Sequence, residues 1–196
     1  MIKYIKKNKL ITILLFLTII TFIIGLLLPS ILNTQITKEI TNNLNTFIYS
    51  IKKEKINYLS YFLNNTKSNL LLTIIIWLLG ISIIGIPIIL LLYLSKIITI
   101  GLEISFLFKN ILSYNIFFII VYILPKLINL LLIFFLVYYS LAYSILLIRI
   151  LFFHKQLDIS KITLRYFKLF IMITLLIIIT SSFEYILHLK ILKNII

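Results

Sequence analysis

Long apolar runs dominate the chain, and short polar or basic stretches separate them. The first run covers residues 10–28, enough for one transmembrane helix because a span takes about 20 apolar residues. Four more runs follow at residues 70–94, 97–108, 115–153 and 167–187. Backbone groups in lipid must be bonded within the protein, so runs of this kind predict helices. We therefore expect an all-α fold, a polytopic transmembrane helical bundle of about five spans with one or more kinked or re-entrant segments.

The lengths of the middle runs leave two arrangements open. A helix from Lys96 to Lys109 would rise only about 20 Å, against a bilayer core of about 30 Å, whereas 115–153 would rise about 58 Å. In the simple arrangement each run is one span, and Tyr139 lies at the cytoplasmic face. In the alternative, 97–109 is re-entrant and 115–153 forms two spans that turn near Tyr139, which then lies at the outer face. We favour the simple arrangement because the two lysines can snorkel and extend a short span.

Residues 29–68 form the only substantial polar region. Within it, apolar residues recur at spacings of three and four, which predicts an amphipathic helix outside the membrane. Such a helix lies on the bilayer surface or forms a docking surface for an extracytoplasmic partner, and the two roles are compatible. The predicted partner-binding stripe consists of Ile36, Ile40, Leu44, Phe47 and Ile51.

Four parts follow from this pattern. They are a basic N-terminus at 1–9, a first transmembrane helix at 10–28, an amphipathic region at 29–68, and a bundle of four helices, or four plus a re-entrant segment, at 69–196.

Charge supports this division of the chain. The sequence has 19 Lys and Arg against 5 Asp and Glu, a net charge of +14, and 62% of its residues are hydrophobic. The basic residues lie at the ends of apolar runs rather than in polar patches, which argues against a nucleic-acid partner and leaves the lipid bilayer. The positive-inside rule predicts a multi-pass protein of the cell membrane with a cytoplasmic N-terminus. The basic loop at 154–168 is then cytoplasmic, and the C-terminus is extracytoplasmic.

Candidate chemistry is sparse. The chain has no cysteine and two histidines, His154 and His188, and neither histidine has a second ligand at helical spacing. It lacks the short motifs of serine hydrolases, zinc proteases and P-loop enzymes. We therefore expect no catalytic residues, no cofactor and no metal. An intramembrane enzyme is the least favoured class, because it would need a convergent polar cluster in the spans.

Three charged residues, Glu103, Lys126 and Glu184, lie well inside the apolar runs. Helix rise puts Glu103 about 10 Å and Lys126 roughly 12 Å from the inner face, so we predict an ion pair between them. The alternative is that Lys126 snorkels and Glu103 is protonated. Glu184 would lie about 25 Å from the inner face, near the outer interface, where water can solvate it.

Glycine and proline interrupt the second apolar run at Gly80, Gly85 and Pro87. Glycine permits close helix approach, and proline bends a helix. The alternative is a broken helix that lines a transport site, but no second broken helix is evident.

The segment from Trp77 to Ile89, with its Trp-Leu-Leu-Gly and Gly-Ile-Pro blocks, resembles the second span of the stage II sporulation protein M family. Further motifs of that family follow in the same order and with similar spacing across most of the chain. The chain departs from the family pattern at Ile97, Leu102 and Lys126. The matching positions are Lys96, Gly101, Phe106-Leu107, Leu124-Pro125 and Ser181-Ser182-Phe183-Glu184-Tyr185.

The resemblance implies a non-catalytic membrane scaffold. Members of this family act in engulfment during endospore formation and help localise a peptidoglycan-degrading pair, stage II sporulation proteins D and P, at the septum. The alternative is a small membrane transporter or permease subunit. A requirement for a soluble partner, together with the absence of substrate flux, would distinguish the scaffold from the transporter. The expected packing positions are Trp77, Gly80, Gly85, Pro87, Gly101 and Pro125.

Overall fold

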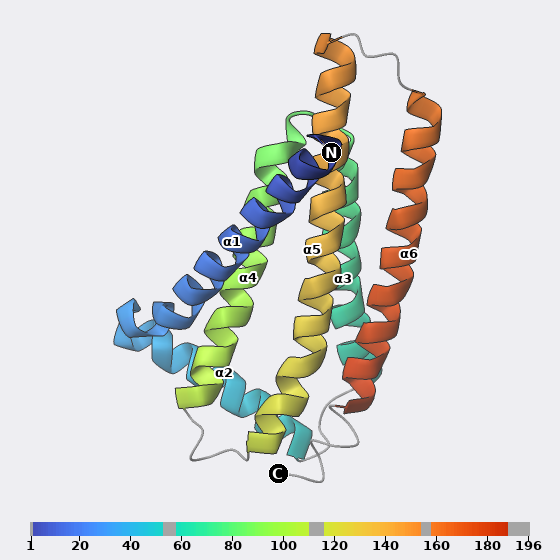
Figure 1. Ribbon diagram of the computed structural model, residues 1–196. Coiled ribbons are helices and arrows are strands. Elements are labelled where there is room, and N and C mark those ends of the chain that lie inside the picture. Colours follow the sequence, from blue (N-terminus) through green and yellow to red (C-terminus); the bar gives the residue numbers. More distant parts are fainter. Residues whose placement is uncertain (1, 53–57, 110–115, 154–157, 188–196) are drawn as a thin grey trace.

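The computed structural model describes residues 2–52, 58–109, 116–153 and 158–187, and those residues form six helices (Figure 1). Five of them, all but α2, are long and apolar enough to cross a membrane. The predicted all-α, multi-pass bundle of five spans is therefore confirmed. The helices are α1 (Ile2–Ile31), α2 (Thr34–Lys52), α3 (Tyr58–Gly80), α4 (Gly85–Lys109), α5 (Ile116–Phe153) and α6 (Ile159–Ile186).

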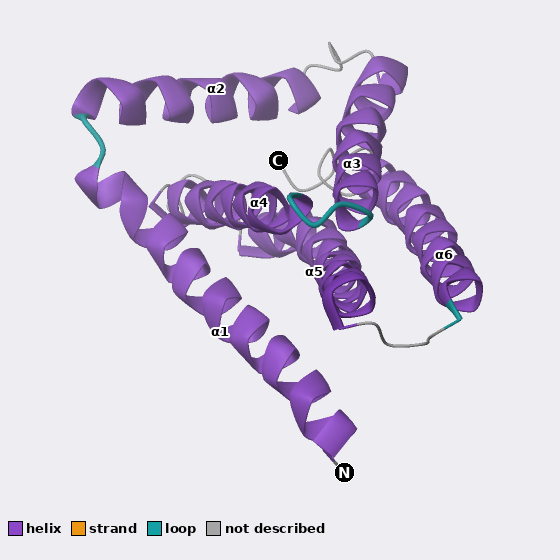
Figure 2. Cartoon of the chain, turned by 90° about the horizontal axis from the view of Figure 1, so that it is seen from above, coloured by secondary structure: helices purple, strands orange, loops and turns teal. Residues whose placement is uncertain are grey.

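Helices α3 to α6 form the bundle, and each runs antiparallel to the one before it (Figure 1). The first helix packs mainly on α4 and leans across it at an angle (Figures 1 and 2). The core lies along α4 and α5, where aliphatic and aromatic side chains interdigitate. Its fully buried members include Tyr93, Ile97, Ile133, Leu136 and Val137.

The second apolar run is two helices rather than one, so the prediction of a single kinked span over 70–94 is wrong. Helix α3 ends at Gly80, whose carbonyl accepts a hydrogen bond from the Ser144 hydroxyl at 2.6 Å. Helix α4 begins at Gly85 and has Pro87 in its first turn. An N–H in the first turn has no partner within the helix, so proline is tolerated there. Pro87 thus helps to start a span instead of bending one.

Because the second apolar run is divided into two helices, the span that contains Lys96 and Lys109 is no longer too short for the bilayer. Helix α4 has 25 residues, a full span with Lys96 near its middle, so it is neither short nor re-entrant. Helix α5 runs unbroken for 38 residues through Tyr139, so the arrangement with a turn there is wrong. Its rise of about 57 Å exceeds the bilayer core, and its end projects beyond the neighbouring helices (Figure 1). The number of spans is unchanged, because the turn expected at Lys96 lies at residues 81–84 instead.

Close backbone contact joins α1 to α4. A Cβ atom on Gly25 would lie 2.8 Å from the Ile98 carbonyl oxygen, and one on Gly101 would lie 2.9 Å from that of Phe22. Small residues let membrane helices approach to this distance. Gly101 therefore has the packing role expected from the sequence, and Gly25 is its counterpart on α1.

Aromatic side chains fill the space around the end of α3. The Tyr166 hydroxyl donates to the Trp77 carbonyl oxygen at 2.9 Å, and a Cβ atom on Gly80 would overlap that hydroxyl. The Trp77 ring stacks on Phe170 with centroids 4.5 Å apart. At Gly85 a Cβ atom would overlap the Leu79 carbonyl. These contacts explain the small residues at the turn.

Pro125 lies inside α5, is buried, and does not end the helix. It is the remaining packing position of the sequence analysis. Tolerance of an internal proline is typical of membrane helices, where neighbouring groups satisfy the freed backbone.

Helix α2 lies outside the bundle, crosswise at one end of it (Figures 1 and 2). A groove of about 510 Å³ separates it from the ends of α1 and α4, and its own lining residues there are polar: Thr37, Lys38, Thr41 and Asn42. On the predicted apolar stripe, Ile36 is 45% exposed and Ile40 is half-buried. The side chains of Leu44, Phe47 and Ile51 lie outside the described residues.

Candidate functional site

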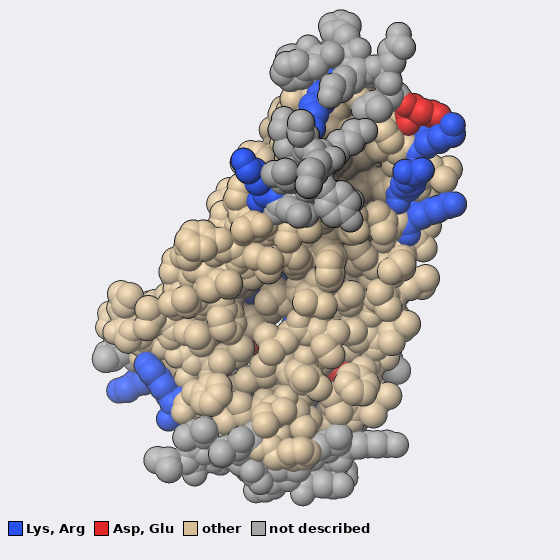
Figure 3. All heavy atoms as spheres, viewed as in Figure 1, with Lys and Arg blue, Asp and Glu red and all other residues tan. Residues whose placement is uncertain are grey.

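A polar cavity of about 110 Å³ lies inside the bundle of α3 to α6. All four helices contribute polar side chains to it, which is unusual in a chain that is otherwise apolar in its spans. Figure 3 shows charged atoms within a narrow hollow in an uncharged surface. The polar residues that line the cavity are Asn65, Asn69, Lys96, Thr99, Glu103, Lys126, Asn129 and Glu184.

Helical spacing brings these residues to one place. Asn65 and Asn69 are four positions apart on α3, and Lys96 and Glu103 are seven apart on α4, so each pair shares a helix face. Burial differs around the cavity: Asn69 is 4% exposed, whereas the side chains of Lys126 and Glu103 are 20% and 30% exposed. Polar groups inside a membrane bundle are retained where they meet partners.

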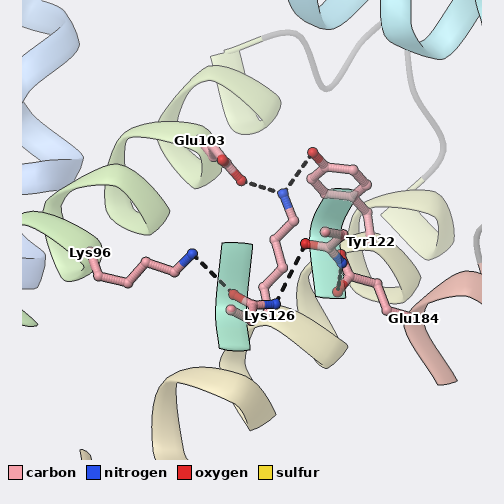
Figure 4. A network of polar contacts seen from close by, with 7 residues as sticks. Lys96, Glu103, Tyr122, Lys126 and Glu184 are labelled. Carbon is pink, nitrogen blue, oxygen red and sulfur yellow. Dashed lines mark hydrogen bonds and ion pairs between the residues drawn. The ribbon is translucent and has the colours of Figure 1, made fainter. Parts of the chain in front are cut away.

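The strongest contact is between α4 and α5. The Lys126 ammonium donates to Glu103 Oε2 and to the Tyr122 hydroxyl, the latter at 2.8 Å (Figure 4). The ammonium nitrogen also lies 4.1 Å from the centroid of the Tyr122 ring. The structure thus brings together the two residues that the sequence analysis paired. Their depth differs from the one predicted, because Glu103 is about 27 Å along α4 from Gly85.

Glu184 does not lie in water at an interface, and that prediction is wrong. It is 2% exposed, and its Oε2 accepts a hydrogen bond from Asn65 Nδ2 at 2.8 Å. Ile177, Ser181 and Glu184 are all buried and follow one stripe of α6, so the carboxylate points into the bundle. Glu184 lies near one end of its helix, as predicted, but its side chain points into the bundle rather than toward water.

Lys96 is a cavity residue rather than the boundary anchor that its charge suggested. Its ammonium donates to Asn69 Oδ1 at 3.4 Å, and Asn69 Nδ2 donates to Asn65 Oδ1 at 3.5 Å. Asn65 in turn donates to Glu184. Two asparagine amides therefore link a lysine on α4 to a glutamate on α6, without a direct ion pair between these two described residues (Figure 4).

Sequence reasoning missed the uncharged members of the site. Asn65 fell in the region assigned outside the membrane, Asn69 was the first residue assigned to the bundle, and Asn129 went unremarked in a long apolar run. Asn129 Oδ1 accepts a hydrogen bond from the Thr180 hydroxyl, which joins α5 to α6. The spacing of four between Asn65 and Asn69, directly before an apolar run, was the available signal.

Two lysines and two glutamates give the cavity no net charge when all four are ionised. Mutual compensation lowers the cost of holding charges in a membrane bundle. A volume of about 110 Å³ has room for several waters, since one needs about 10–15 Å³. Among the described residues, no three His, Cys, Asp or Glu side chains gather as metal ligands. The arrangement can fix the relative positions of α3 to α6 and can hold small polar molecules.

Comparison with known families gives a match over most of the chain. The model of the family described as stage II sporulation protein M matches residues 12–184, which include most of the first and last spans, all of the other three, α2 and every residue that lines the cavity. No curated protein and no solved structure matches. The chain belongs to the stage II sporulation protein M family.

Proposed function

We propose that this protein is an integral membrane scaffold that helps localise septal peptidoglycan-degrading enzymes during engulfment in endospore formation. Family membership supports a sporulation role in the membrane. The expected partners are stage II sporulation proteins D and P or similar peptidoglycan hydrolases. In this proposal the five spans are the anchor, and the chain itself carries out no catalysis.

The observation that carries the proposal is the position of α2. An amphipathic helix that only completed its own bundle would turn its apolar stripe inward. Here the residues of α2 that face the ends of α1 and α4 are polar, and Ile36 is exposed. The described part of the stripe, at Ile36 and Ile40, is therefore on the side of α2 away from the bundle and is available to another surface, whether a partner or the bilayer.

Charge distribution supports an extracytoplasmic position for α2. Lys9, Arg149, Arg165 and Lys168 are exposed at the end of the bundle opposite α2 (Figures 1 and 3). The positive-inside rule favours the cytoplasm for such an end. Helix α2 and the end of α6 then face outward, toward the compartment that contains the peptidoglycan.

The test separates partner recruitment from membrane anchoring. The double variant Ile36→Ser, Ile40→Ser removes apolar groups from the stripe, and Gln35→Ser, Asn42→Ser makes two changes on the polar side of the same helix. We expect a fluorescent septal hydrolase to disperse in sporulating cells with the first variant and to stay at the septum with the second. Immunoblotting of membranes controls for insertion. Unchanged localisation with a stably inserted stripe variant would mean that α2 is only a surface anchor.

The cavity favours a second candidate, a small transporter or permease subunit. Ionisable side chains inside a membrane bundle often mark a solute or proton path. Purified protein in liposomes would then give ion currents or solute uptake that Lys96→Met abolishes. Absence of flux together with a defect in hydrolase localisation would favour the scaffold.

A further inference from the structure

A third hollow, separate from the charged cavity and from the groove beside α2, lies between α5 and α6. Its volume is about 200 Å³, below the roughly 300–1,000 Å³ of sites that enclose a whole drug-sized ligand. It therefore suits part of a molecule whose remainder lies in the bilayer. We call it the tyrosine groove, and it is lined by Tyr138, Tyr139, Ala142, Tyr143, Leu146, Ile162, Arg165, Tyr166 and Leu169.

One buried polar atom of the tyrosine groove has no hydrogen-bond partner among the described residues. It is the hydroxyl of Tyr138, and the residue as a whole is 4% exposed. The other two buried tyrosines of the groove are satisfied, since Tyr166 bonds to Ser140 and Tyr143 to Thr163, each at 2.8 Å. A buried hydroxyl without a partner is costly, so Tyr138 marks a position where an outside acceptor would be stabilising.

Positive charge surrounds the mouth of the groove. The exposed Arg165 lines it, and Lys161 and Lys168 lie one turn away on either side along α6 (Figure 3). Asp158, the one acid among the described residues at this end, is already paired with Lys161 at 2.9 Å. An anion at the mouth would thus meet Arg165 without a competing carboxylate.

Along α6 the groove runs from Ile162, near the start of the helix, past Arg165 to Leu169. Arg165 is six residues from the start of α6, and Leu169 lies about 6 Å deeper along the same helix. Leu146 and Ile162 line the part of the groove nearer the start of α6, on the other side of Arg165. Basic pockets between membrane helices bind anionic headgroups, and here the apolar Leu169 lies deeper in the span than the arginine.

We propose that the tyrosine groove binds one anionic phospholipid. Arg165 donates to the lipid phosphate, and the Tyr138 hydroxyl donates to a glycerol ester oxygen. The upper part of one acyl chain covers Leu169 and continues into the bilayer. Free phosphate would engage the arginine alone and leave both the hydroxyl and Leu169 uncovered.

Native mass spectrometry of the full chain in mild detergent tests the site. Phosphatidylglycerol and phosphatidylcholine with identical chains are titrated onto wild type, Arg165→Gln and Lys168→Gln, the two variants that each remove one positive charge from α6. We expect tighter binding of phosphatidylglycerol than phosphatidylcholine. Arg165→Gln should weaken phosphatidylglycerol binding about tenfold, because charge-assisted hydrogen bonds are lost, and Lys168→Gln less than twofold.

A second variant and a competitor complete the design. Tyr138→Phe deletes only the unpartnered hydroxyl and should weaken binding of the same lipid severalfold. Equal affinity for the two lipids, or equal losses in the two charge variants, would overturn the proposal in favour of diffuse surface attraction. Displacement by inorganic phosphate at concentrations comparable to the lipid would overturn the lipid assignment.

Discussion

Lys126 on α5 and Glu103 on α4 form an ion pair inside the bundle, and the Tyr122 hydroxyl accepts a second hydrogen bond from the same ammonium. Insertion scales put a lone charged side chain at the centre of a membrane helix at about 2.5–3.5 kcal/mol. Pairing offsets part of that cost and ties two neighbouring antiparallel helices together. The contact is therefore well suited to a test of how α4 and α5 pack in the bundle.

Charge reversal should act on the pair as a unit. We expect Glu103→Lys and Lys126→Glu each to lower the amount of protein in the membrane severalfold, because each leaves two like charges in contact. The double swap restores opposite charges and should recover most of the wild-type level in quantitative immunoblots. Lys109→Glu, at the exposed end of α4, is the control. A double swap no more abundant than the worse single variant would show that the two residues are not coupled.

The contact between α1 and α4 should be sensitive to added volume. Gly25→Val would push side-chain atoms into the backbone of Ile98, so we expect a loss of about 1–3 kcal/mol in the free energy of unfolding. Unfolding of the purified protein by SDS in mixed micelles would measure it. Ile24→Val changes the adjacent, exposed position and should have little effect. Equal stability of the two variants would mean that α1 does not pack as described.

Single-cysteine labelling should reveal the orientation, and the chain has no native cysteine to interfere. Ile84, in the turn between α3 and α4, is 77% exposed, and Ile36 on α2 is exposed at the other end. With a membrane-impermeant maleimide on intact cells, we expect Ile36→Cys to be labelled and Ile84→Cys to be protected. Both should react after permeabilisation. The reverse pattern would invert the proposed topology and place α2 in the cytoplasm.

The start of α6 should respond to pH through Asp158, the single aspartate in the chain. Hydrogen bonds from the Lys161 side chain and then from its backbone N–H hold the pKa of Asp158 below its ordinary value of 3.8. A depressed pKa in the folded state means that the cap stabilises above the ordinary pKa and is lost as pH falls through the lower, folded value. Carbon-13 NMR of labelled aspartate should show Lys161→Ala raising the pKa and Lys168→Ala leaving it unchanged. No change with Lys161→Ala would show that the Lys161 ammonium does not hold the pKa of Asp158 down.

The number of spans could be predicted because it depends on total apolar length, which the sequence states directly. The position of the turn could not be predicted. Gly80 to Pro87 has the same composition whether proline bends one helix or begins the next, and the Ser144 contact that ends α3 comes from a distant helix. Contacts between distant segments therefore decided between two locally equivalent interpretations.

The site was predictable only in part, for a related reason. Counting residues gives depth along a span, and it correctly put Glu184 near a helix end. Glu103 and Lys126 were paired because similar depths were expected for them, although the depth expected for Glu103 was wrong since α4 begins at Gly85. Counting residues does not give the rotation of a helix about its axis. A span that is apolar on every side has no stripe to indicate which face is buried, so the inward direction of Lys96 and Glu184 could not be read from the pattern.

Lys96 and Glu184 supply the last prediction, because amides rather than direct contact connect them. A double-mutant cycle with Lys96→Met and Glu184→Gln should give a coupling energy of about 0.5 kcal/mol or less in SDS unfolding. The matched cycle with Lys126→Met and Glu103→Gln, whose charged atoms touch, should give about 1–3 kcal/mol. Asn69→Leu breaks the chain of hydrogen bonds at its middle and should abolish the smaller coupling while leaving the larger one intact. Equal coupling in the two cycles would mean that Lys96 and Glu184 meet directly across the cavity, and the amide connection would then be wrong.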